Sequence, residues 1–294
     1  MTRAAKDEAA MNWRSVLAAP ILQLRTKNIF VQAATAVAVV CLIVALSIKL
    51  WQRVEPHVAA RPEYLMPAGR IEITPTPEWI HTSVQAEVIR DSGLREPLSI
   101  LDDKLNARLT QAFSLHPWIS RVVAVRASYP PRIQVDLQYR RPVAMVEVLG
   151  GLLPIDVDGV LLPTEDFSPQ DAQGYPRIAS IVSGPLGPLG TRWGDPAVEA
   201  AAKLAPVLQP VWQEYRLHHV QLQPRLGPSA KFVLELVAVG GTTFVWGSPP
   251  GSEAGDESSA AEKLALLTRL RTAHGSVAEI PLALRDLRRA DTPN

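Results

Sequence analysis

The sequence contains a single cysteine, Cys41, and it lies inside a long apolar run. The rest of the chain therefore has no disulfide, no thiolate nucleophile and no zinc site built on cysteine. Asn-X-Ser/Thr sequons are also missing, which argues against a glycosylated ectodomain. The formal net charge is only +1 over 294 residues, so no global electric field selects a nucleic acid or an acidic substrate.

Motifs that carry catalysis are absent as well. The sequence has no G-x-S-x-G elbow, no S-x-x-K nucleophile and no P-loop lysine. No two histidines stand at a chelating i, i+4 spacing beside a carboxylate, so we expect no metal site. The glycines of residues 184–190 alternate with prolines, which lack the N–H groups that a phosphate cradle needs. We therefore predict a protein that is not an enzyme and uses no cofactor, against the alternative of a membrane-anchored hydrolase.

Residues 29–48 form an apolar run without any charged side chain. As a helix, a run of this length spans roughly 30 Å, the thickness of the hydrocarbon core of a bilayer. Basic residues flank both ends and Trp51 follows, as expected for snorkelling cations and an interfacial aromatic. A buried core helix would show a polar face, and a signal peptide would have a shorter apolar region with a cleavage site after it. The run predicts an uncleaved membrane anchor, although the basic residues on its two sides balance and do not orient it.

The remaining chain predicts an α+β fold. We expect a tail at residues 1–28, a proline-containing linker at 49–69, and a first domain at 70–141 with the order strand, helix, helix, strand, strand. Ser83, or its neighbour Thr82, can cap the first helix, which Gly93 closes.

In the same domain, the second helix begins near Ser99, and residues 133–139 alternate between apolar and polar side chains, as a half-buried strand does.

A mainly antiparallel β domain is predicted for residues 142–294. Gly150-Gly151 predicts a hairpin, and Asp195-Pro196 starts a helix that Pro206 should interrupt. Residues 248–259 are rich in Gly, Ser, Pro and acidic side chains and predict a flexible loop. A helix capped by Ser258 or Ser259 follows, and the leucines after it predict a last strand.

The run from His116 to Val148 resembles the signature of the FtsQ/DivIB family of bacterial cell division proteins. In that family a POTRA (polypeptide-transport-associated) module follows a single membrane anchor, which corresponds here to residues 70–141. Thr74-Pro75-Thr76-Pro77 departs from the pattern, and the Gly/Pro stretch at 184–190 is an unfamiliar insertion. The signature falls on Pro117, Trp118, Val125, Arg126, Pro130 and Pro142.

The resemblance implies a single-pass protein of the bacterial inner membrane, with a cytoplasmic N terminus and a periplasmic C-terminal domain at the division septum. It implies a non-enzymatic scaffold that links early and late division proteins, binds FtsB- and FtsL-like partners and so influences septal peptidoglycan synthesis. A POTRA-bearing component of a secretion or envelope-assembly complex is the alternative.

The family binds its partners by strand addition at the C terminus. The matching residues are Ile280, Leu282, Leu284, Asp286, Leu287 and Arg288. The same stretch could instead be only the last strand of the core.

Overall fold

The computed structural model describes residues 29–94, 97–223 and 232–289, so the predicted tail at 1–28 lies outside the described residues. The chain divides into two units, Met1–Arg61 and Pro62–Asn294. In the first unit, helix α2 covers Ile29–Ala59, and its segment Val31–Ala59 is long and apolar enough to cross a membrane. The helix continues past the predicted end at residue 48 into the predicted linker. No glycine interrupts residues 49–59, and Pro56 falls in the last turn of the helix, where its missing N–H removes only one backbone hydrogen bond.

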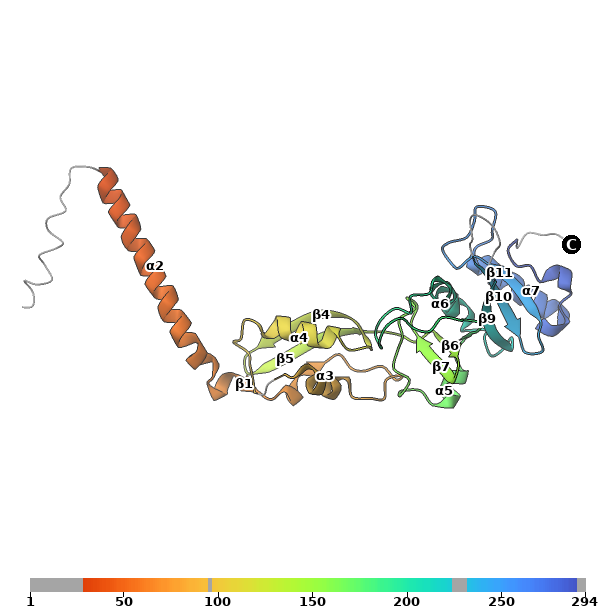
Figure 1. The fold of residues 1–294 in the computed structure, drawn as a ribbon, viewed down its shortest axis with the longest axis horizontal. Helices are drawn as coiled ribbons and strands as arrows, with labels where there is room; N and C mark the ends of the chain where they lie inside the picture. Colours follow the sequence, from red (N-terminus) through yellow and green to blue (C-terminus); the bar gives the residue numbers. More distant parts are fainter. Residues whose placement is uncertain (1–28, 95–96, 224–231, 290–294) are drawn as a thin grey trace, which may run out of the picture. The chain divides into compact units, whose positions relative to one another are not determined.

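The second unit begins with a three-stranded sheet, in residues that we call the first module (62–141; Figure 1). The strand order is β2-β5-β4, with β4 and β5 antiparallel and β2 parallel to β5. The elements follow the predicted order and bury Val84, Leu105, Leu109 and Phe113 of the two helices in a shared core. Their bounds are β2 Glu72–Ile73, α3 Val84–Ser92, α4 Leu105–Ser114, β4 Ile119–Ser128 and β5 Arg132–Tyr139.

The caps of α3 are those that the sequence predicts. The Ser83 hydroxyl accepts a hydrogen bond from the Ala86 N–H at 3.4 Å, and Gly93 ends the helix in the left-handed conformation with φ of 60°. The predicted start of α4 was wrong, because Ser99 belongs to a short strand, β3 (Leu98–Ser99), that pairs with β1 (Leu65–Met66). Helix α4 starts at Leu105, directly after a turn in which the Asp102 carboxylate accepts a hydrogen bond from the Lys104 N–H at 2.9 Å.

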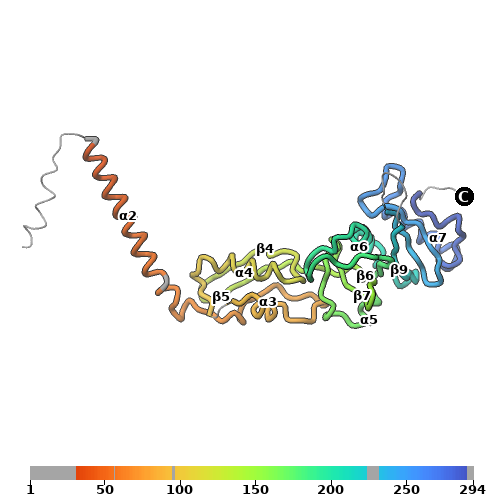
Figure 2. The backbone as a smooth tube through the Cα atoms, in the orientation of Figure 1, coloured from red at the N-terminus to blue at the C-terminus, as the bar shows by residue number. Residues whose placement is uncertain are grey.

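The second module (residues 142–289) contains a six-stranded sheet with the order β11-β10-β9-β8-β6-β7. The sheet is mixed, because β8 pairs in parallel with both β6 and β9 while the other neighbours are antiparallel. Figure 2 traces its backbone from green to blue. The bounds are β6 Ala144–Val148, β7 Gly151–Ile155, α5 Pro169–Gln173, β8 Arg177–Ile178, α6 Pro196–Leu208, β9 Leu217–Gln223, β10 Val233–Ala238, β11 Thr243–Gly247 and α7 Ala260–His274.

Helices α6 and α7 both begin at a predicted cap. Helix α6 starts at the expected Asp195 cap, but it runs through Pro206 instead of breaking there. Pro206 lies in the last turn, where only one backbone hydrogen bond is lost. Helix α7 has the predicted cap at Ser259, with Glu262 completing a capping box.

The predicted C-terminal strand is not formed. Leu282–Leu284 is a 3₁₀ turn that follows a second 3₁₀ turn, Val277–Glu279. Burial does not follow the alternating pattern of a strand. Ile280 and Leu287 are buried, whereas Leu282, two residues after Ile280, is 79% exposed. Pro281 directly precedes the Leu282–Leu284 turn, and the Arg285 Nε donates to the Ile280 carbonyl at 2.8 Å. This bond ties the two ends of the turn together.

Candidate partner-binding edge

Strand β11 lies at one edge of the six-stranded sheet, and the C-terminal segment covers part of that edge. The Val245 N–H donates to the Arg285 carbonyl at 2.9 Å, and the Leu287 N–H donates to the Val245 carbonyl at 2.9 Å. These two bonds form a parallel bridge between Val245 and Asp286. The segment at residues 285–287 therefore lies outermost at this edge of the sheet, although it is too short to count as a strand.

The apolar members of the sequence-predicted binding residues divide into two groups. Ile280 and Leu287 are fully buried and anchor the segment in the core of the second module. Leu282 and Leu284 are exposed by 79% and 39% and lie on the 3₁₀ turn. The structure therefore brings the six residues together as an anchored turn rather than as an extended strand.

The backbone of Asp286 faces away from the sheet. In a parallel bridge of this pattern, the residues before and after Asp286 bond to β11, so its own N–H and C=O point outward. Its carboxylate accepts hydrogen bonds from the Arg288 Nε at 2.9 Å and from the Arg288 N–H at 3.1 Å. The hydrogen bond from the Arg288 side chain lowers the pKa of Asp286, against the opposing effect of partial burial.

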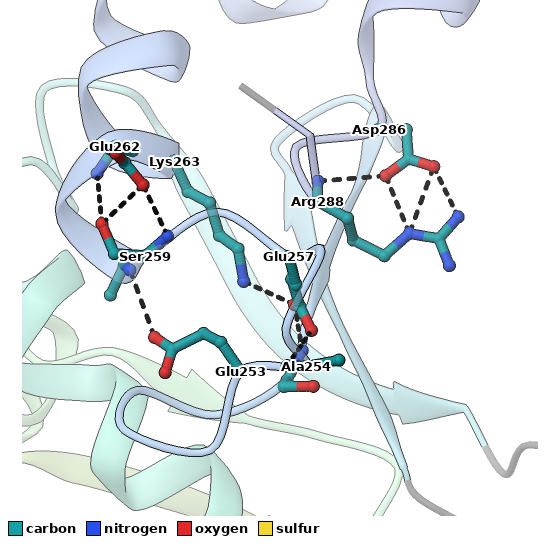
Figure 3. A network of polar contacts seen from close by, with 10 residues as sticks. Glu253, Ala254, Glu257, Ser259, Glu262, Lys263, Asp286 and Arg288 are labelled. Atoms are coloured by element: carbon teal, nitrogen blue, oxygen red, sulfur yellow. Dashed lines mark hydrogen bonds and ion pairs between the residues drawn. The ribbon is translucent and has the colours of Figure 1, made fainter. Parts of the chain in front are cut away.

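A buried ion pair fixes the loop beside this edge (Figure 3). The Lys263 side chain is fully buried, and its Nζ donates to Glu257 Oε1 at 2.6 Å while lying 5.3 Å from the centroid of the Trp246 ring. The Ser248 N–H donates to the same carboxylate oxygen at 2.7 Å. Burial raises the pKa of Glu257, but the hydrogen bonds from Lys263 and Ser248 outweigh it and leave the pKa below its ordinary value.

Gly247 permits the close approach of this loop. Its φ is +97°, and a Cβ there would lie 2.1 Å from Glu257 Oε1 and 2.8 Å from Arg288 Cγ. Any larger residue would therefore displace the carboxylate that neutralises Lys263. Flexibility of residues 248–259 stays a prediction, but the loop carries a buried anchor that the sequence analysis missed. The available signal was a lysine on the leucine-bearing face of α7, four residues before Leu267.

The same loop reaches the C-terminal segment. The Ser258 N–H donates to the Arg288 carbonyl at 2.8 Å, and Asp256 pairs with Arg289 at 2.9 Å. Both backbone groups of Arg288 are thus occupied, because its N–H already donates to Asp286. At this edge the backbone groups of Asp286 are left facing outward.

The family-signature residues lie elsewhere, and Trp118 among them lies at the junction of the two modules. Trp118 is fully buried, and its Nε1–H donates to Asp166 of the second module at 2.7 Å. Asp166 is only 2% exposed and also accepts from the N–H groups of His81 at 2.7 Å and Thr82 at 2.8 Å. One carboxylate therefore joins three segments, which the sequence analysis did not anticipate.

The other signature residues are dispersed along the first module. Pro117 lies under Gly190, where a Cβ would come within 3.0 Å of the Pro117 Cα, and Pro142 is buried at the start of the second module. Arg126 of β4 pairs with Asp136 of β5, and Pro130 is in the turn between these strands. Val125 is half-buried. These residues therefore do not form one site.

This edge presents backbone groups that are available for pairing. Its charged side chains are paired with one another, and its outward feature is a backbone N–H and C=O at the edge of a sheet, which can pair with another chain. In residues 29–94, 97–223 and 232–289, no three His, Cys, Asp or Glu side chains gather as a metal site would require.

The fold and the site thus define a mixed α+β protein with a helix, α2, able to cross a membrane and a sheet edge partly closed by its own C-terminal segment. The chain is 31% identical over 112 residues to the cell division protein FtsQ of Anaeromyxobacter sp. (strain K). The match covers 34% of this chain and 37% of that protein, about a third of each. No family model matches the chain. The match to FtsQ supports a distant FtsQ-like relationship.

Proposed function

We propose that the chain is a single-pass division protein that acts by binding and positioning its partners, without catalysis. Helix α2 would anchor it in the inner membrane, with the N terminus in the cytoplasm and the second unit in the periplasm at the septum. The FtsQ relative supports the role in cell division, and the length and composition of Val31–Ala59 support the anchor.

The first module is proposed to be a POTRA module. Its support is the order β2-α3-α4-β4-β5, interrupted only by the two-residue strand β3 between the helices, with both helices packed into one core with a three-stranded sheet. The buried Trp118, which the family signature includes, bonds to Asp166 and so couples this module to the second one.

The observation that carries the binding role is the outward backbone of Asp286. An FtsB- or FtsL-like partner would add an extended segment beside residues 285–287, with backbone hydrogen bonds to the N–H and C=O of Asp286. Leu282 and Leu284, both exposed, would give the partner an apolar contact next to that pairing. Through these contacts the protein would influence septal peptidoglycan synthesis.

Replacing Asp286→Pro tests this proposal directly. Proline removes the outward N–H, and its ring obstructs an added strand. Because proline also disfavours the αR conformation of Arg285, the comparison requires that hydrogen exchange at the Leu287 amide, which bonds to β11, is equal in the two variants. The matched control is Asp286→Ala, which removes the same carboxylate and keeps the N–H. We expect Asp286→Pro to weaken capture of a co-expressed FtsB-like partner at least about tenfold relative to Asp286→Ala, the equivalent of about 1.4 kcal/mol.

The measurement is quantitative co-purification of the full chain from membranes, with thermal unfolding to show that both variants remain folded. Equal capture by the two variants would mean that the partner does not pair with the backbone of Asp286, and the proposed binding mode would then be abandoned.

A further inference from the structure

We propose that the loop at residues 248–259, here called the acidic loop, restricts strand addition at this edge and so acts as a guard. The Ser258 N–H binds the carbonyl of Arg288 and thereby confines strand addition to Asp286. The buried ion pair of Glu257 and Lys263 keeps Ser258 in place. The inference deepens the proposed function by giving the same edge a built-in restriction, and it rests on that function only for the identity of the partner.

The guard has a direct contact with the segment that it restricts. A strand added along residues 286–288 would pair with the outward groups of Asp286 and then with the carbonyl of Arg288. The Ser258 N–H already holds that carbonyl at 2.8 Å, and Asp256 binds the Arg289 side chain at 2.9 Å. A partner that pairs beyond Asp286 has to displace the Ser258 N–H from the Arg288 carbonyl.

Ser258 cannot move aside at low cost, because its two neighbours are fixed. Glu257 precedes it and is bonded to the buried Lys263 and to the Ser248 N–H. Ser259 follows it and forms the capping box of α7, with its hydroxyl bonded to Glu262 Oε2 at 2.8 Å. Moving the Ser258 peptide therefore strains either a buried ion pair or a helix cap.

Edge strands with free backbone groups pair with other chains and with copies of themselves, and proteins commonly cover them for that reason. Because the Arg288 carbonyl is occupied, only the N–H and C=O of Asp286 in this segment are available for pairing. A partner therefore binds through a short contact that can be released. Exposed pairs such as Asp256 and Arg289 add little by themselves, so the backbone bond from Ser258 is the main element of the guard.

The test compares Ser258→Pro with Ser258→Ala in the full chain. Proline deletes the N–H that binds Arg288, whereas alanine keeps it and removes only the hydroxyl. We expect Ser258→Pro, relative to Ser258→Ala, to speed hydrogen exchange at the Leu287 amide about tenfold, because the segment loses one of its tethers. We also expect stronger self-association in sedimentation velocity and about threefold tighter capture of the FtsB-like partner.

A second variant covers the case in which Ser258→Pro does not fold. The double replacement Glu257→Met with Lys263→Met removes the charges that hold the loop and fills their space with apolar side chains, a change that buried ion pairs often tolerate. It should produce the same three effects, and Glu214→Gln, which breaks an exposed ion pair with Arg271 far from the edge in sequence, serves as its control.

The outcomes separate the two proposals. If exchange at Leu287 and self-association are the same in the proline variant, the double variant and their controls, the guard is refuted whatever happens to capture. If exchange and self-association rise while no variant captures the partner, the guard stands and the proposed partner binding fails.

Discussion

Asp166 offers the sharpest test of how the two modules are joined. Its carboxylate accepts hydrogen bonds from the N–H groups of His81 and Thr82 and from the Nε1–H of Trp118, all within 2.8 Å. Replacing Asp166→Ala leaves these three donors without their acceptor. A buried donor that loses its partner costs about 1–3 kcal/mol.

The full sum of these costs is not expected. Asp166 also lines a pocket of about 510 Å³ together with Trp79 and Tyr175, so water can reach part of the vacated space. We expect the free energy of unfolding to fall by about 3–4 kcal/mol in Asp166→Ala. Asp166→Asn keeps one oxygen for the two backbone donors and places an NH₂ group near Trp118 or Thr82. It should cost about 1–2 kcal/mol.

The assay is urea unfolding of the full chain in detergent micelles, followed by tryptophan fluorescence, with Trp118→Phe completing a double-mutant cycle. Because Trp118 and Asp166 share a hydrogen bond, the cycle should give a coupling energy of about 1–2 kcal/mol. A loss below about 1 kcal/mol in Asp166→Ala, or a coupling near zero, would refute the reasoning that this carboxylate links the modules.

Two further predictions concern the ion pair under the edge. Lys263→Met leaves Glu257 without its buried partner and should lower the free energy of unfolding by about 3–5 kcal/mol, whereas Glu214→Gln should cost less than about 1 kcal/mol; equal losses in urea unfolding would contradict this. The native pKa of Glu257 lies below its ordinary value of 4.5, so the stability from this group is present above that value and is lost as pH falls below it. The urea midpoint of the wild type should therefore fall more steeply below about pH 5 than that of Glu257→Gln, and parallel curves would exclude this role.

Local sequence patterns predicted the elements whose ends are set by their own residues. Ser83 and Gly93 define α3 because a cap and a left-handed glycine act within one turn of the helix. The alternation at residues 133–139 predicted β5 because one face of that strand is buried, with Ile133 and Val135 inside.

The predictions failed where distant residues decide the structure. Ser99 is a residue type that commonly caps helices, but pairing with β1 places it in a strand. The leucines at 282 and 284 resemble an alternating strand, yet Ile280 and Leu287 alone are buried and the chain turns between them.

The junction could be predicted only in part. A buried tryptophan normally needs an acceptor for its N–H, so the Trp118 of the signature implied a polar partner. Nothing local identified Asp166 as that partner, because the two residues are brought together only by the packing of one module on the other.

Leu162 belongs to the second module in sequence, but its side chain is fully buried in the core of the first. A chain emerging from the ribosome has therefore completed β5 before the last piece of that core has been made. A truncated fragment that stops at residue 141 would carry a gap where a leucine should be, and gaps of this size cost about 2–5 kcal/mol. The boundary of an expression fragment should accordingly be placed beyond Phe167, and nascent chains shorter than this should remain susceptible to proteases.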